Sequence, residues 1–190
     1  SGPDGYIYDP DGITTKEKFD FMLEMRASGR NKVQDYADKF GCKFVAGDKP
    51  WGEKVDIIMP CATQNDVDLT QAKRIVANNI KYYIEVANMP TTNEALRFLM
   101  DQKNMVVAPS KAVNAGGVLV SALEMSQNSE RYSWTAEEVD SKLHQVMTDI
   151  HDGSAAAAER YGLGYNLVAG ANIVGFQKIA DAMMAQCIAW

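Results

Sequence analysis

The 190-residue sequence has few of the residues that build disulfide frameworks and metal sites, with three cysteines and two histidines. Cys42, Cys61 and Cys187 are odd in number and widely spaced, which argues against a disulfide framework and for a reducing compartment. We therefore expect a cytoplasmic protein. His144 and His151 lie on one predicted helix without converging carboxylates, so we expect no metal site.

Long apolar runs and basic clusters are also missing. Charge or glycine interrupts each apolar stretch well short of the roughly 20 residues that a membrane span needs. The polar start of the chain does not resemble a secretory leader. The net charge of −6 comes without a cluster of Lys or Arg, which argues against nucleic-acid binding. We expect neither a membrane nor a nucleic acid as a partner.

The composition that remains is typical of a globular protein, with 46% hydrophobic and 23% charged residues. Short apolar runs predict strands at 43–45, 55–60, 82–86 and 105–108, the second of them buried on both faces. Capping patterns and apolar stripes predict helices after Thr14, over 32–40 and 68–78, from Thr91 to Met100, from Ala115, from Thr135 and after Asn172. Alternation of strands and helices from residue 55 predicts βαβ units and a parallel sheet.

The segment from residue 108 to residue 125 carries the most chemical information. It joins a predicted strand to a predicted helix, and Asn114, Val118, Ser121 and Met125 recur along one face of that helix. This face combines an amide, an apolar middle and a hydroxyl. Such a face could line a pocket for a small polar ligand.

Two interpretations of this segment stay open. Gly116 and Gly117 cost helix stability, roughly 1 kcal/mol each relative to alanine, which favours a close approach of a ligand to the backbone. Asn114 is alternatively an ordinary N-cap whose side chain accepts a hydrogen bond from the first helical turn. Small residues also allow a helix to pack tightly against its neighbours.

Ligands of open α/β sheets bind outside the carboxyl ends of the strands. This rule selects three loops, 61–65, 87–90 and 109–114, and each contains an asparagine. Neutral amides and hydroxyls suit ribose hydroxyls and a carboxamide. Turn chemistry explains any one of these loops, but three loops at one sheet edge predict a dinucleotide site.

A glycine-rich phosphate turn is missing from this pattern. No G-x-G-x-x-G follows a predicted strand, although dinucleotide folds normally open with one. Either the protein does not bind dinucleotides, or the chain lacks the first strand and turn of the fold. Residues 1–6 read as a loop that should follow a strand, which favours the second alternative.

Four segments closely resemble one protein family: 60–65 (PCATQN), 85–91 (EVANMPT), 109–118 (PSKAVNAGGV) and 124–129 (EMSQNS). The resemblance is to hexameric bacterial glutamate dehydrogenases, most nearly the clostridial NAD-dependent type. It implies an α/β fold with an incomplete Rossmann-like, doubly wound parallel sheet over residues 1–130. The first strand and its glycine-rich turn would be absent, and C-terminal helices over residues 131–190 would reach toward an absent N-terminal domain.

The resemblance also implies the reversible oxidative deamination of L-glutamate to 2-oxoglutarate and ammonia, in a homo-hexamer. NAD is the implied coenzyme, and NADP is not excluded. Ala62, Thr63 and Gln64 would lie along the coenzyme. Asn88 would lie near the nicotinamide ribose and Asn114 at the carboxamide.

Three further roles follow from the resemblance. Val118 and Ser121 match positions that line the glutamate pocket, where Ser121 would hydrogen-bond the side-chain carboxylate. Asp4 matches the end of the second Rossmann strand and could accept a hydrogen bond from the adenine ribose.

The family carries its catalytic lysine and aspartate in the N-terminal domain. We therefore expect no catalytic residue in this chain, and we expect the chain alone to be inactive. Two alternatives remain: a non-catalytic α/β binding or structural module, and a dehydrogenase of the same superfamily that acts on another amino acid.

Overall fold

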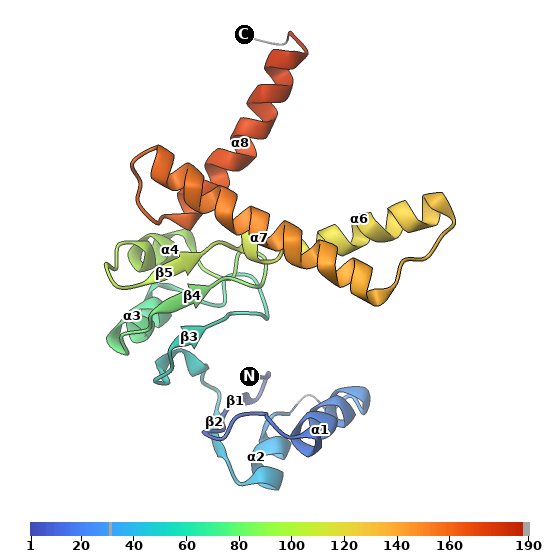
Figure 1. Ribbon diagram of the computed structural model, residues 1–190. Coiled ribbons are helices and arrows are strands. Elements are labelled where there is room, and N and C mark those ends of the chain that lie inside the picture. Colours follow the sequence, from blue (N-terminus) through green and yellow to red (C-terminus); the bar gives the residue numbers. More distant parts are fainter. Residues whose placement is uncertain (31, 188–190) are drawn as a thin grey trace. The chain divides into compact units, whose positions relative to one another are not determined.

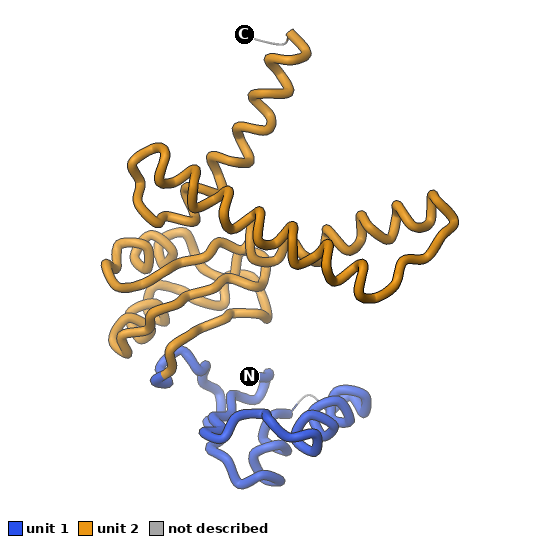
Figure 2. Tube along the Cα trace, in the orientation of Figure 1, with its two compact units in different colours: residues 1–54 blue, residues 55–190 orange. Residues whose placement is uncertain are grey.

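The computed structural model describes residues 1–30 and 32–187. The chain divides into two compact units, unit 1 with residues 1–54 and unit 2 with residues 55–190 (Figure 2). Each unit has its own sheet and helices. The boundary between the two compact units lies between residues 54 and 55. The domain boundary at residue 130 stays a prediction.

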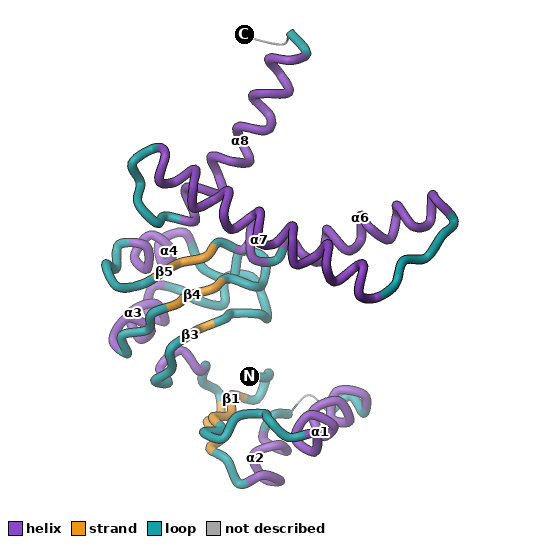
Figure 3. Tube along the Cα trace, viewed as in Figure 1, coloured by secondary structure: helices purple, strands orange, loops and turns teal. Residues whose placement is uncertain are grey.

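Unit 1 combines a two-stranded antiparallel sheet with short helices (Figure 3). Its elements are β1 (Gly5–Tyr8), α1 (Lys16–Ala27), α2 (Gln34–Phe40), β2 (Lys43–Ala46) and the 3-10 helix η1 (Pro50–Gly52). The prediction of a loop over residues 1–6 is wrong at its end, because β1 begins at Gly5 and pairs with β2. Four strand residues between two turn-rich segments are too few for a periodic signal.

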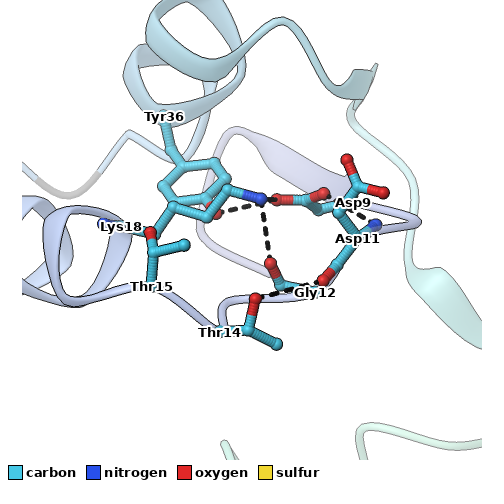
Figure 4. Close-up of polar contacts among 7 residues, drawn as sticks. All are labelled: Asp9, Asp11, Gly12, Thr14, Thr15, Lys18 and Tyr36. Carbon is cyan, nitrogen blue, oxygen red and sulfur yellow. Dashed lines mark hydrogen bonds and ion pairs between the residues drawn. The ribbon is translucent and has the colours of Figure 1, made fainter.

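The carboxylate of Asp9, in the loop after β1, contacts both main helices of unit 1 (Figure 4). It forms a largely buried ion pair with α1 and a hydrogen bond with α2. Asp9 Oδ2 accepts hydrogen bonds from Lys18 Nζ of α1 at 2.7 Å and from the Tyr36 hydroxyl of α2 at 2.9 Å. The Asp9 and Lys18 side chains are only 7% and 14% exposed. The hydrogen bond from Lys18 lowers the pKa of Asp9 below its usual value.

Unit 2 contains the predicted parallel sheet and two confirmed βαβ crossovers (Figure 1). Its elements are β3 (Ile57–Ile58), α3 (Leu69–Ala77), β4 (Tyr82–Ile84), α4 (Asn93–Met100), β5 (Val106–Ala108), α5 (Ser110–Val113), α6 (Ala115–Glu130), α7 (Ala136–Arg160) and α8 (Leu167–Ala185). The strand order is β3-β4-β5, so each strand lies beside its neighbour in sequence. All three strands therefore end at the same edge.

The two faces of this sheet differ in burial. Ile58, Tyr83 and Val107 are paired across the strands and are 5%, 0% and 7% exposed. On the opposite face, Ile57 and Tyr82 are 50% and 45% exposed. The prediction that the strand at 55–60 is buried on both faces is wrong, because β3 lies at the edge of the sheet within the described residues and one face stays uncovered.

Three helices are capped by residues other than the predicted ones. Thr15 and Thr92, rather than Thr14 and Thr91, cap α1 and α4, and Thr91 is instead buried against the Tyr83 hydroxyl. The capping box at Thr135 is confirmed. The cap of the last helix is Asn166 and not Asn172, so α8 begins earlier than predicted. None of the described helices combines the length and the apolar character needed to cross a membrane.

Helices α7 and α8 meet at a backbone-to-backbone contact. A Cβ atom added to Gly170 of α8 would lie 1.9 Å from the carbonyl oxygen of Ser154 in α7. Both residues are buried. The contact is possible only because glycine has no side chain at this position.

We expect Gly170→Ala to destabilise the chain by about 1–3 kcal/mol, because the methyl group would push α8 away from α7. Gly175→Ala is the matched control: it lies on the same helix with open space around it, and it should stabilise by up to about 1 kcal/mol. Urea unfolding monitored by circular dichroism measures both. Equal stability of the two variants would contradict the close packing.

We expect the Asp9 carboxylate to make unit 1 sensitive to acid. Because its pKa is lowered on folding, its stabilising effect is complete above the unfolded value of about 4 and is lost as the pH falls through the folded value. Asp9→Asn should therefore be less stable at neutral pH and should lose less stability on acidification. Urea unfolding across a pH series measures this, with Trp51 as the reporter after the other two tryptophans, Trp134 and Trp190, are replaced by Phe.

Asp11→Asn is the control for this series, since Asp11 is exposed beside the same loop. It should keep the pH dependence of the parent chain. The same pH dependence in Asp9→Asn and Asp11→Asn would refute the role of the buried pair.

Candidate functional site

The three loops selected from the sequence lie together at the carboxyl edge of the unit 2 sheet. The backbone N–H of Asn65 donates to Met89 O at 3.0 Å, and Ala87 N donates to Pro60 O at 2.9 Å. These bonds join the loop after β3 to the loop after β4. The topology thus confirms that the strand-end loops share one edge, where a parallel α/β sheet binds its ligands.

Asn114 connects this edge to helix α6. It is the residue before α6, but its side chain makes no capping hydrogen bond to that helix. Instead, Asn114 Nδ2 donates to Val86 O at 3.2 Å and to Asn88 Oδ1 at 2.7 Å. The structure thus leaves Asn114 at the predicted helix start but directs its amide across to the end of β4.

The network fixes the orientation of both amides. A backbone carbonyl can only accept, so the Asn114 atom that faces Val86 O is the nitrogen, and both of its hydrogens are used within the protein. Within the described residues, Asn114 Oδ1 and Asn88 Nδ2 have no hydrogen-bond partner. The edge therefore presents one free acceptor and one free donor.

The loop after β3 contributes an exposed polar segment. Ala62, Thr63 and Gln64 are all exposed, and in the described part of the chain no hydrogen bond engages the side chains of Thr63 and Gln64. Asn65 closes the loop with a φ of 56°, a left-handed conformation that asparagine tolerates better than most residues. The loop thus offers free hydroxyl and amide groups beside the amide pair.

Asp4 belongs to unit 1 and has a structural role of its own. Its carboxylate accepts from Val33 N at 3.2 Å and from Gln34 N at 3.1 Å, at the start of α2. Desolvation raises the pKa of Asp4, but the backbone donors of Gln34 and Val33 outweigh it and leave the pKa below its usual value. Asp4 therefore caps a helix whose N-cap residue, Val33, has no polar side chain to do so.

The predicted ligand face of α6 is uncovered. Val118 and Met125 are 78% and 70% exposed, and Ser121 is exposed between them. Ser121 Oγ donates to the carbonyl oxygen of Gly117 at 3.1 Å, which leaves its lone pairs free. A cavity of about 700 Å³ includes Ser121 and Met125 in its lining.

The two glycines at the start of α6 have different surroundings. A Cβ at Gly116 would lie 3.1 Å from Leu143 Cδ1 and 3.6 Å from Met147 Sδ of α7, whereas nothing lies within 4 Å of one at Gly117. The close approach expected at these glycines is made at Gly116 by the neighbouring helix α7, in agreement with the packing interpretation. Gly117 alone borders open space.

One residue that sequence reasoning missed lies directly beneath this site. Glu85 follows β4, is 3% exposed, and its Oε2 accepts from Ser110 N at 3.2 Å. A carboxylate within the apolar run 82–86 (YYIEV) is the signal that could have identified it. Among the described residues, no group of three or more His, Cys, Asp or Glu side chains could hold a metal ion.

Comparisons with known proteins give a consistent result. Residues 1–187 match the family model described as glutamate/leucine/phenylalanine/valine dehydrogenase. The chain is 90% identical over 190 residues to an NAD-specific glutamate dehydrogenase of Clostridium symbiosum, covering all of this chain and 42% of that protein. It is 50% identical over 192 residues to an NAD(P)-specific glutamate dehydrogenase of Xylanibacter ruminicola, covering 99% of this chain and 42% of the relative.

A solved structure of a glutamate dehydrogenase has the same fold. It superposes with a TM-score of 0.96 at 89% identity, over all of this chain and 42% of the solved one. The chain thus spans less than half the length of the relatives that it matches.

Proposed function

Because the chain belongs to the glutamate/leucine/phenylalanine/valine dehydrogenase family, we propose that it forms the coenzyme-binding part of an NAD-dependent glutamate dehydrogenase. The observation that carries this proposal is the amide pair at the sheet edge. Asn114 Oδ1 is a free acceptor for the NH₂ group of a carboxamide, and Asn88 Nδ2 is a free donor for a neighbouring ribose hydroxyl. Neutral amides at the carboxyl ends of parallel strands fit the nicotinamide end of the coenzyme.

The other proposed coenzyme contacts follow from the resemblance to glutamate dehydrogenases. Asn114 binds the carboxamide, and Asn88 lies near the nicotinamide ribose. Ala62, Thr63 and Gln64 extend along the coenzyme from the neighbouring strand end. Asp4 caps α2 through both carboxylate oxygens, and their remaining lone pairs accept a hydrogen bond from a hydroxyl of the adenine ribose. This contact favours NAD over NADP.

The chain holds and orients the reactants. The bound coenzyme supplies a hydride acceptor. Asn114 would fix the ring by its carboxamide, and Val118 would line the glutamate pocket. Ser121 lies two helical turns from Asn114 and donates to the glutamate side-chain carboxylate once its hydroxyl leaves Gly117 O. Asn114, Val118 and Ser121 are neutral, and the resemblance implies that the lysine and aspartate that transfer protons lie in the N-terminal domain of the family.

The exposed apolar surface of α8 supports assembly with further protein. Phe176, Ile179 and Met184 are 71%, 61% and 63% exposed. Contiguous exposed apolar surface marks protein interfaces. We propose that the complete enzyme is a cytoplasmic homo-hexamer acting on L-glutamate and 2-oxoglutarate.

A chimera tests this function. The segment of the Clostridium symbiosum enzyme that matches this chain is replaced by the chain itself, and glutamate-dependent formation of NADH is measured. Activity comparable to the parent enzyme is expected. A chimera that assembles but does not turn over would support the alternative of a non-catalytic module, and a preference for leucine, valine or phenylalanine would support the other alternative.

Substrate choice is tested by Ser121→Val in the chimera. Loss of the hydroxyl should reduce the preference for glutamate in kcat/KM by about 1–3 kcal/mol, because the side-chain carboxylate loses a donor. Ser126→Val is the matched control, since Ser126 is exposed on the same helix and its Oγ donates to Ala122 O in the same way. Unchanged discrimination in Ser121→Val, or an equal loss in both variants, would refute the role of Ser121.

A further inference from the structure

Glu85 is a buried carboxylate at the end of β4. Its side chain holds Ser110 N at 3.2 Å, and its own backbone N–H donates to Ala108 O at 3.0 Å. Glu85 also lines a cavity of about 630 Å³ together with Thr91, Ser110 and Lys111. Burial of a carboxylate is costly unless it is hydrogen-bonded, so this position needs an explanation beyond packing.

Helix α5 explains why a carboxylate is needed here. It has four residues, and the preceding Pro109 has no side chain that could cap it. Ser110 N, the first N–H of this helix, would therefore lack a partner within the protein at a half-buried turn. The Glu85 carboxylate comes from the neighbouring strand and takes this hydrogen, in a charge-assisted bond that is stronger than a neutral one.

The same stretch of chain also holds the other end of α5. Asn114 ends α5 and precedes α6, and its amide is bound by Val86 O and Asn88 Oδ1. Residues 85–88 thus fix the four-residue helix at its first and last positions. These two attachments, with the bond from Lys111 Nζ to Asn172 Oδ1 of α8, set its rotation and with it the direction of the Asn114 amide.

We propose that Glu85 is a positioning residue that orients Asn114 toward the coenzyme carboxamide without touching the coenzyme. The inference rests on the proposed function, because it takes Asn114 as the carboxamide contact. Without the bond to Ser110, α5 keeps its attachments at Lys111, which donates to Asn172 of α8, and at Asn114, but its first turn is free to shift. A displacement of about 1 Å is enough to weaken a positioned contact substantially.

The test uses the chimera described above and measures KM for NAD, KM for glutamate and thermal stability. Glu85→Ala should raise KM for NAD about tenfold, and Glu85→Gln about threefold, because Gln keeps an acceptor oxygen but loses the charge. KM for glutamate should change less than KM for NAD. Tyr83→Phe is the matched control: it removes the buried bond to Thr91 on the same face of β4 and should lower stability without changing KM for NAD.

A double-mutant cycle with Asn114→Ala separates this inference from the proposed function. If Asn114→Ala leaves KM for NAD unchanged, the proposed carboxamide contact is wrong. If Asn114→Ala raises it, then Glu85→Gln should add almost nothing in the Asn114→Ala background. Independent, additive effects would overturn the positioning role, as would an equal effect of Tyr83→Phe. Because the cycle uses Glu85→Gln, it remains decisive even if Glu85→Ala fails to fold.

Discussion

The side-chain amide of Asn114 is the interaction on which the geometry of the unit 2 site depends. It bonds to the backbone of one strand end and the side chain of another residue in the same loop, and it lies between a four-residue helix and a sixteen-residue one. The strand edge, the short helix and the start of α6 are therefore held by one group. An ordinary N-cap would have satisfied α6 alone and left the loop after β4 unattached.

The order of elements in unit 2 was predictable because local signals agree with the tertiary fold. Short apolar runs separated by capped helical segments leave few topologies besides a parallel sheet. Details that depend on neighbours were not predictable. Thr91 and Thr92 are equivalent as caps by residue type, and only the Tyr83 hydroxyl, eight residues away, decides between them. The burial of the strand at 55–60 likewise depends on what lies beside it, which its own composition does not encode.

In the candidate site, too, local patterns were predictable and contacts between distant residues were not. Polar residues after strands indicated the edge, and helical spacing indicated the face with Val118 and Ser121. The explanation for Gly116 required the position of Leu143 in a helix that begins about twenty residues later. Glu85 stands out in the sequence as a carboxylate in an apolar run, but its partner is a backbone N–H, which residue types do not reveal.

Helix α8 is attached to the rest of unit 2 near its first turns. Its first turns are fixed to α7 by the contact at Gly170, and Asn172 is bound by the Lys111 ammonium beside the strand-end cavity. The remaining turns extend beyond these contacts (Figure 1). Their apolar side chains Phe176, Ile179 and Met184 are exposed. A nineteen-residue helix is about 28 Å long, so a rotation of about 5° at its root moves the tip by about 2 Å. A protein bound at the tip would therefore also shift Asn172 and its partner Lys111. Lys111 follows Ser110, whose backbone N–H donates to Glu85.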